Sequence, residues 1–286
     1  MFIQRLTIIG VGLIGGSLAR RLKQNGQCGE IIGCGRNIQN LQQAVALGVI
    51  DRYDTDPAQA VAAADVVVVA VPLGAMAKIF ATIQPHLAAD AIITDVGSAK
   101  GSVVKDAHQH LGRHFARFVP AHPIAGTEKS GVAASFAELF ERRLVILTPV
   151  TETHPQASSQ IKTLWQQTGA EIVEMSVNHH DEVLAATSHL PHLLAYTLVD
   201  TLAQLADRQE IFRFAAGGFR DFTRIASSDP RMWHDICLAN RDAILTILAQ
   251  FNQDLSQLTT AIRQNDGPTI EAVFSRAKTA RDNFCG

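Results

Sequence analysis

Uninterrupted apolar runs alternate with amphipathic stretches through the first 176 residues of the chain. Three of these runs, 31–34, 66–71 and 92–96, lack the polar alternation of a half-exposed strand. Strands covered on both faces show this pattern, which is typical of parallel sheets. The segments 38–47 and 73–87 between them have helix-forming composition, which gives the βαβα order of a doubly wound α/β fold.

Three further short apolar runs follow in the same half of the chain. They occupy residues 118–119, 144–147 and 171–174. Because the preceding runs predict a parallel sheet, we expect these segments to extend it.

The pattern changes after about Asn178, where helical periodicity replaces the strand-like runs. Apolar residues spaced by four, three, four, three and four positions predict one face of a long helix; they are Ile244, Leu248, Phe251, Leu255, Leu258 and Ile262. The segment 190–205 is apolar nearly all round, which predicts burial in a bundle or between subunits. We therefore expect two domains, 1–176 and a helical domain, 177–286, that forms a homodimer. The alternative is an intramolecular bundle without a partner.

Composition narrows the class of partner. The 286 residues are 47% hydrophobic and 18% charged, and the formal net charge is −2. Without a dense run of lysine or arginine, the chain has no electrostatic basis for binding nucleic acid or a membrane surface. The longest apolar stretch, 61–71, contains Asp65 and is too short to cross a bilayer. We expect a small-molecule partner, and no nucleic acid or membrane.

The cysteines and the N-terminus indicate a cytoplasmic protein. The four cysteines form no CxxC pair and are too few for a disulfide framework, so reduced thiols are expected. The first strand begins by about Arg5, which leaves no charged-then-apolar signal peptide. The sequence predicts no metal site.

A glycine-rich loop follows the first apolar run. Gly10, Gly12 and Gly15 have the GxGxxG spacing, between a strand-like run and a predicted helix at 17–25. In a dinucleotide-binding loop the first glycine permits the tight turn, the second lets the backbone approach a pyrophosphate, and the third lets the helix pack on the strand. Leu13 and Ile14, within the same loop, are also predicted to bind the cofactor. The alternative is a glycine turn that only packs a βα unit.

The end of the second strand bears on the choice of cofactor. NAD-binding units usually place an acidic residue about 20 positions beyond the glycine loop, on the ribose 2′-hydroxyl. Arg36 and Asn37 stand in this region, and the acid is missing. Arg36 can bind a 2′-phosphate and Asn37 can donate a further hydrogen bond, so NADP is the expected cofactor. If Arg36 instead points to water, the pocket accepts NAD as well.

Two polar clusters follow predicted strands of the first half. In the stretch 95–100, Ser98 is placed to cap the next helix or to face a ligand. In the stretch 121–128, His122 is fixed in a loop by a proline and a glycine and could act as a general base. Ligands of doubly wound folds bind at the carboxyl ends of the strands, which is where both clusters are expected.

A third cluster lies in the helical half. It joins the histidines of the stretch 188–192 to the glycine-rich segment 217–230, which contains Arg224. Two histidines and an arginine in such loops suggest an anion site. Taken alone, Arg224 would more often form a surface ion pair, for instance with Asp221, and His189 would cap a helix or satisfy a core hydrogen bond.

The order of these motifs resembles the prephenate and arogenate dehydrogenases, also called cyclohexadienyl dehydrogenases, of tyrosine biosynthesis. The resemblance covers nearly the whole chain, through GVGLIGGS at 10–17, DVGSAK at 95–100, AHPIAGTEKSG at 121–131, TSHLPH at 187–192 and GGFRDFTRIASSDPRMW at 217–233. It implies a nucleotide-binding domain, a mostly helical dimerisation domain and an active site in the cleft between them.

The resemblance also implies roles for individual residues. In the family's reaction, hydride leaves C4 of a cyclohexadienyl ring for the nicotinamide while carbon dioxide leaves C1. By resemblance, His122 accepts the proton of the C4 hydroxyl, and Ser98 bonds this hydroxyl or His122 itself. Arg224 would bind a substrate carboxylate through the two parallel hydrogen bonds that a guanidinium can form.

Three further residues match the substrate or nicotinamide pocket of the family. Ser188 and His192 are expected to line it. Glu128 matches a position near the substrate side chain, where it would hydrogen-bond or gate the substrate; otherwise it is a solvated carboxylate. Trp233 is expected to pack the pocket wall.

Two other functions compete with this one. A β-hydroxyacid dehydrogenase or imine reductase also joins a Rossmann domain to a helical one, but typically uses a catalytic lysine, whereas this chain has the loop of His122. The other is a nucleotide-sensing protein that has lost catalysis, which the presence of His122, Ser98 and Arg224 disfavours.

Overall fold

The computed structural model describes residues 1–127 and 129–285. The chain forms two compact units, Met1–Arg241 and a second that begins at Asp242.

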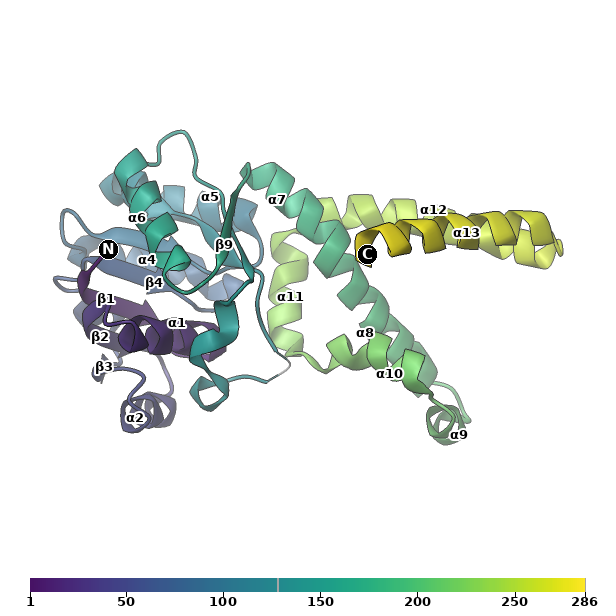
Figure 1. Ribbon diagram of the computed structural model, residues 1–286, viewed down its shortest axis with the longest axis horizontal. Coiled ribbons are helices and arrows are strands. Elements are labelled where there is room, and N and C mark those ends of the chain that lie inside the picture. Colours follow the sequence, from purple (N-terminus) through teal and green to yellow (C-terminus); the bar gives the residue numbers. More distant parts are fainter. Residues whose placement is uncertain (128, 286) are drawn as a thin grey trace. The chain divides into compact units, whose positions relative to one another are not determined.

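The first unit is built on a six-stranded parallel sheet (Figure 1). Its strands are β1 (Ile3–Ile9), β2 (Cys28–Cys34), β3 (Arg52–Asp54), β4 (Val66–Val69), β5 (Ile92–Asp95) and β6 (Phe118–Val119). They are arranged in the order β3-β2-β1-β4-β5-β6, which is the order of the Rossmann fold. The predicted doubly wound parallel sheet is therefore confirmed.

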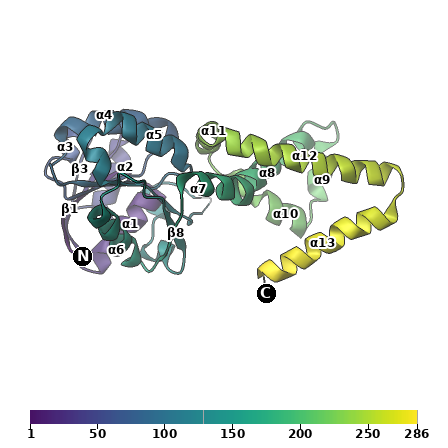
Figure 2. The same ribbon diagram turned by 90° about the horizontal axis from the view of Figure 1, so that it is seen from above.

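Helices cover both faces of this sheet (Figure 2). One face packs against α1 (Leu13–Gln24), α2 (Ile38–Ala46) and α6 (Pro155–Gln166), and the other against α3 (Pro57–Ala60), α4 (Met76–Ile83) and α5 (Lys100–His110). In β4, Val66 and Val68 join the first core while Val67 and Val69 join the second. Burial on both faces explains why this strand has no polar alternation.

Short 3₁₀ turns connect many of these elements. They are η1 (Leu73–Ala75), η2 (Gln84–His86), η3 (Gly112–Arg117), η4 (Val132–Ala134) and η5 (Ala137–Phe140). The predicted helix 73–87 is thus divided into η1, α4 and η2. Its α-helical part ends at Ile83, and Pro85, which has no N–H to donate to a continued helix, lies in the 3₁₀ turn that follows.

A second sheet of three strands corrects one prediction. It contains β7 (Ala121–Pro123), β8 (Leu144–Leu147) and β9 (Glu171–Glu174), with β7 antiparallel and β9 parallel to β8. The prediction that 144–147 and 171–174 extend the main sheet is therefore wrong; of the three runs, only 118–119 does so. Pro120 separates β6 from β7 and has no N–H to donate, so the chain leaves the first sheet there and enters the second.

Helices make up the rest of the first unit. They are α7 (Val177–Leu184), a π-helical turn η6 (Ala185–His189), α8 (Leu190–Ala203), α9 (Arg208–Arg213), α10 (Gly217–Thr223), the 3₁₀ turn η7 (Arg224–Ser227) and α11 (Pro230–Ala239). The Tyr196 hydroxyl of α8 donates to the Ser228 carbonyl at 2.5 Å, and the Asp229 side chain caps α11. In α8 only Leu190 and Ala195 are buried, so the apolar surface of this helix is only partly covered by its own chain.

The second unit consists of α12 (Arg241–Arg263, whose first residue still belongs to the first unit) and α13 (Gly267–Cys285). The predicted long helix over 244–262 is confirmed. Asn265 ends α12 in the left-handed region with φ 54°, and the Asp266 side chain accepts from the Thr269 amide at the start of α13. Among the described residues, no helix is long and apolar enough to cross a membrane.

Candidate active site

The glycine loop, residues 10–15, joins β1 to α1 in a conformation that requires its glycines. Gly10 has φ +101°, and a Cβ there would lie 2.2 Å from the Ala70 carbonyl oxygen. A Cβ at Gly15 would lie 2.5 Å from the Gly10 oxygen, which explains the close packing of α1. At Gly12 a Cβ would meet nothing within 4 Å, so the backbone faces open space.

The start of α1 fits a pyrophosphate. Gly12 is the N-cap and supplies no side chain to the first amides of the helix, which belong to Leu13, Ile14 and Gly15. Uncapped amides at a helix N-terminus carry partial positive charge and bind anions. The residues of the glycine loop therefore fit a dinucleotide, as the sequence predicts.

The end of β2 lies beside this loop. The Gly10 amide donates to the Cys34 carbonyl at 2.8 Å, so the segment that contains Arg36 and Asn37 begins next to the glycine loop. Both side chains are exposed. Asn37 also caps α2, because its Oδ1 accepts from the Asn40 amide at 3.0 Å. Its amide nitrogen can still donate to a ligand.

Asn40 connects the glycine loop to a more distant segment. Its Nδ2 donates to the Val11 carbonyl at 2.8 Å, and its Oδ1 accepts from the Val132 amide at 3.3 Å. The chain segment that leaves β7 and its histidine is therefore fixed, at η4, to the cofactor side of the sheet.

The carboxyl edge of the sheet connects the glycine loop to His122. Ile9 pairs with Val69, and Val69 pairs with Asp95, so the ends of β1, β4 and β5 lie in one row. The Asp95 Oδ1 then accepts from the Ala121 amide at 3.1 Å, one residue before His122.

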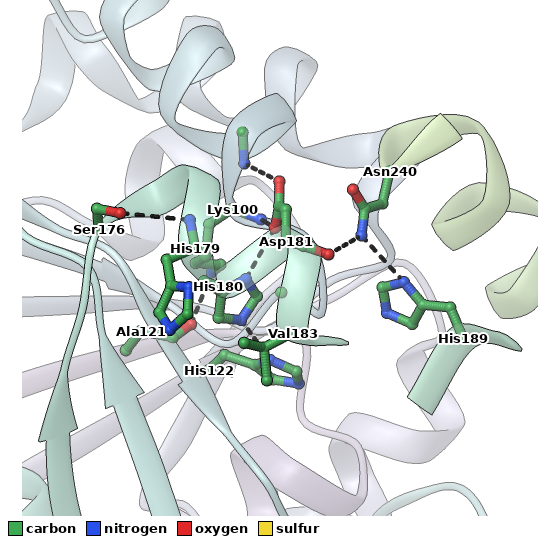
Figure 3. Close-up of polar contacts among 12 residues, drawn as sticks. Lys100, Ala121, His122, Ser176, His179, His180, Asp181, Val183, His189 and Asn240 are labelled. Atoms are coloured by element: carbon green, nitrogen blue, oxygen red, sulfur yellow. Dashed lines mark hydrogen bonds and ion pairs between the residues drawn. The ribbon is translucent and has the colours of Figure 1, made fainter. Parts of the chain in front are cut away.

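Three side chains, His122, His180 and Asp181, form a histidine relay (Figure 3). The His122 Nδ1 lies 2.8 Å from the His180 Nε2, and the His180 Nδ1 lies 2.7 Å from the Asp181 Oδ1. A carboxylate only accepts hydrogen bonds, so His180 donates from Nδ1 and, when neutral, accepts at Nε2. His122 must then donate from Nδ1, which leaves the lone pair of its Nε2 for a substrate proton.

The electrostatics support neutral histidines in the relay. Burial lowers the pKa of His122 well below 6.5, and the nearby His180, Lys100 and His189 lower it further. Burial also lowers the pKa of His180, although its bond to Asp181 acts in the opposite direction. Burial raises the pKa of Asp181, but hydrogen bonds from His180 and from the Lys100 and Gly101 amides outweigh this effect and hold it below its usual value.

Asp181 also caps a helix from a distant part of the chain. Its two carboxylate oxygens accept from the amides of Lys100 and Gly101, each at 2.8 Å, at the start of α5. The N-cap of α5 is Ala99, which makes no side-chain cap, so the alternative that Ser98 caps this helix is wrong. Ser98 is half-buried and directly precedes the N-cap.

The remaining histidines are tied to the same network. The Asn240 Nδ2 donates to the Asp181 carbonyl at 2.8 Å and lies 3.1 Å from the His189 Nδ1 (Figure 3). His189 is buried, and burial lowers its pKa to about 4. The alternative that His189 makes a core hydrogen bond thus agrees with the structure.

His192 stacks on Trp233 at a ring-centroid distance of 3.7 Å and an interplanar angle of 21°. Its Nδ1 donates to the Ser188 carbonyl at 2.8 Å. Burial lowers the pKa of His192, the bond to Ser188 raises it, and the charge of Arg224 lowers it. Arg224, at the start of η7, is exposed and close enough to act on this imidazole.

The structure thus brings most of the predicted catalytic and substrate-binding residues into one network. Hydrogen bonds and ring packing connect His122, the main chain beside Ser98, Ser188 and His192, and the charge of Arg224 acts on His192. Glu128 lies outside the described residues. Sequence reasoning missed His180, Asp181, Asn240 and Lys100. The signal for two of them was present, since a His-His-Asp run at 179–181 begins directly after the predicted domain boundary.

A Rossmann sheet with an uncapped glycine loop and a buried histidine at the same edge fits a nicotinamide-dependent dehydrogenase. Comparison with known proteins gives the family. Residues 18–174 match the nucleotide-binding domain of prephenate dehydrogenase, and residues 176–276 match its dimerization domain. The chain belongs to the prephenate dehydrogenase family.

Individual relatives are similar over nearly the whole chain. A cyclohexadienyl dehydrogenase of Zymomonas mobilis is 42% identical over 282 residues, which cover 97% of this chain and 95% of the relative. A prephenate dehydrogenase of Bacillus subtilis is 39% identical over 98% of this chain and 76% of its own length. The crystal structure of prephenate dehydrogenase from A. aeolicus, in complex with hydroxyphenyl propionate and NAD+, has a TM-score of 0.91 and 37% identity, and covers 99% of both chains.

Proposed function

We propose that this protein catalyses the NAD(P)-dependent oxidative decarboxylation of prephenate, arogenate or both, forming 4-hydroxyphenylpyruvate or tyrosine. The histidine relay carries the proposal. In the relay, the neutral imidazole of His122 does not use its Nε2 lone pair. A base that removes a hydroxyl proton needs such an available lone pair. Membership of the prephenate dehydrogenase family supplies the substrate class.

The chain's own residues have distinct roles in this reaction. A nicotinamide nucleotide held at the glycine loop would supply the acceptor for the hydride that leaves C4 of the ring, as carbon dioxide leaves C1. His122 takes the hydroxyl proton on Nε2 as the hydride departs, and His180 and Asp181 stabilise the imidazolium that forms. Ser98 orients the hydroxyl, and Arg224 binds a substrate carboxylate. Ser188 and His192 line the same pocket.

One steady-state experiment tests the function. The purified protein is offered prephenate and arogenate, each with NAD and with NADP, and the reduced nicotinamide is followed by absorbance. Turnover of at least one substrate is expected. Binding of reduced cofactor without turnover in any of the four combinations would instead favour a nucleotide sensor.

For the cofactor we infer a preference for NADP over NAD. The end of β2 has no acidic residue between Cys34 and Ile38, and an acid there would repel a 2′-phosphate. The exposed guanidinium of Arg36 supplies a matching charge, and the Asn37 amide can donate beside it. The NAD+ in the A. aeolicus structure belongs to that protein, and dual use of NAD remains the competing outcome.

Arg36→Asp tests this inference. The substitution is expected to lower kcat/KM for NADP by roughly 10-fold or more, since a charge-assisted hydrogen bond contributes about 1.5–3 kcal/mol. The value for NAD should stay the same or rise. Arg52→Asp, on the exposed edge strand β3, is a charge-matched control. Equal efficiency with both cofactors in the wild type, or no effect of Arg36→Asp, would contradict the phosphate role.

We also propose a homodimer. The matched dimerization domain supports it, as do large apolar side chains that this chain leaves more than a third exposed, namely Leu205, Leu238, Leu245, Leu255, Ile262 and Phe274. The boundary at 176/177 and a cytoplasmic location stay predictions.

A further inference from the structure

A fully buried ion pair lies beneath the histidine relay. Lys100 of α5 and Asp95 of β5 both have 0% side-chain exposure, and the Lys100 ammonium donates to the Asp95 Oδ2. The same ammonium donates to the Ala121 carbonyl at 2.7 Å, while the Asp95 Oδ1 accepts from the Ala121 amide at 3.1 Å. Both main-chain polar groups of the residue before His122 are therefore held by this one pair.

Within this pair, burial lowers the pKa of Lys100, while the charge of Asp95 and its hydrogen bond act in the opposite direction. Asp95 accepts from the Lys100 ammonium and from two main-chain amides, those of Gly97 and Ala121. The Lys100 ammonium has two acceptors, the Asp95 carboxylate and the Ala121 carbonyl, and these bonds compensate its buried positive charge.

Stability alone does not explain a buried pair of this kind. Removing two charges from water is costly, and well-packed apolar residues often stabilise a core as well or better. At the crossing from β6 to β7, however, the chain passes from one sheet to another, and no ladder of main-chain bonds joins β5 to β7. At Ala121 the side chains of Asp95 and Lys100 make the main-chain hydrogen bonds that a neighbouring strand would otherwise supply.

We propose that Lys100 is a positioning residue for the base His122: together with Asp95 it fixes the peptide of Ala121, and it places a positive charge beside an imidazole that must be neutral to act. This inference rests on the proposed role of His122.

The charged and titratable groups around His122 come from four elements. They are Asp95 on β5, Lys100 on α5, His180 and Asp181 on α7, and His189 on η6. After burial and His180, Lys100 is the next cause that lowers the pKa of His122. The negative charge of Asp181 is compensated by His180 and by the amides at the start of α5. The charge that compensates Asp95 is the ammonium of Lys100. Loss of the ammonium therefore removes a positive charge and leaves a negative one, and both changes favour imidazolium.

The test is the pH profile of kcat/KM for Lys100→Met. A base must be deprotonated, so the acid limb of the wild-type profile is expected below pH 6.5. In the variant this limb should move to higher pH by roughly 0.5–1 unit, as expected for the loss of one nearby charge. The value of kcat at its plateau should also fall roughly 10-fold, because the imidazole is less well placed. The KM for the cofactor should not change.

Two further variants control this result. Asp95→Asn/Lys100→Met removes both charges, which avoids an unpaired buried carboxylate and protects folding; its acid limb should also move upward, by less than that of the single variant. Lys162→Met removes an exposed lysine that pairs with Glu174, and it should leave the profile unchanged. An acid limb and a plateau kcat that stay at the wild-type values in folded, cofactor-binding Lys100 variants would overturn the proposal.

A direct titration covers the case in which the variants do not fold. The imidazole of His122 in the wild-type protein is followed by NMR with labelled histidine, and its signal is assigned with His122→Asn. It should remain neutral down to below pH 6.5, and a pKa at or above 6.5 would overturn the charge effect. If the wild type turns over neither substrate, the proposed function fails, while the same titration of the Lys100 variants still measures the effect of the ammonium.

Discussion

His122 combines a specific tautomer with a neutral state, and its substitution gives the clearest test at the scale of single residues. His122→Asn should lower kcat by roughly 10²–10⁴-fold, because general-base assistance is lost. The dissociation constant of the cofactor should stay near the wild-type value, since the glycine loop lies on other elements. Stopped-flow turnover and fluorescence titration of the cofactor measure the two quantities.

The neighbouring His179 provides a control for this substitution. It is exposed and lies outside the relay, so His179→Asn should leave kcat unchanged. A near-normal rate for His122→Asn would show that another group accepts the proton.

The sequence predicted the site residues that belong to local motifs, and missed those defined by contacts between distant segments. Gly10, Gly12 and His122 belong to recognisable motifs, so their type and spacing were informative, although the structure places His122 in strand β7 and not in the predicted loop. Asp181 acts on α5, 80 residues earlier, and Asn240 bonds to Asp181 from 59 residues later. Such pairings follow from tertiary packing, which single-sequence periodicity does not contain.

At the scale of elements, the start of α5 depends on a carboxylate from α7. Asp181→Asn should lower the free energy of unfolding by about 1–3 kcal/mol at neutral pH, because charge-assisted bonds to two helix amides are weakened. It should also lower kcat, because the tautomer of His180 is no longer fixed by a carboxylate. Urea unfolding and steady-state kinetics measure the two effects.

The pH dependence of this stability effect follows from the lowered pKa of Asp181. A carboxyl whose pKa is lower in the folded state contributes its full stabilisation above its unfolded pKa, and loses it as the pH falls through the folded value. The difference between wild type and Asp181→Asn should therefore be constant near neutrality and shrink below about pH 4. Asp56→Asn removes the same charge from the cap of α3, where the Asp56 Oδ1 accepts from the Ala58 amide, and it should leave kcat unchanged. A constant difference down to pH 3 would contradict the ionic role.

The elements themselves were predicted unevenly. The buried strands β2, β4 and β5 and the helix α12 follow from their apolar patterns. The edge strand β3 was missed, because it has only three residues, Arg52–Asp54, and none of them is fully buried. β8 and β9 were predicted as strands but assigned to the wrong sheet, since an apolar run does not specify its neighbour.

At the scale of the whole molecule, the exposed apolar side chains of the second unit predict self-association. Sedimentation velocity should give about twice the mass of one chain at micromolar concentration, as most oligomers of this kind are two-fold dimers. Leu255→Glu places a charge among those side chains and should shift the protein towards monomer. Gln257→Glu, on the opposite side of α12, should not. A monomeric wild type would contradict the dimer.

The two bonds of Asn40 have a consequence for protein engineering. The Asn40 side chain bonds to Val11 in the glycine loop and to Val132, which follows β7 along the chain. Asn40 is also only three residues from Asn37, which is predicted to bind the cofactor. A programme that redesigns residues 36–40 to change cofactor selectivity therefore also changes the anchor of the segment that begins at His122, the proposed base. Libraries in this region should be screened for turnover number as well as cofactor selectivity, and should keep Asn40 constant.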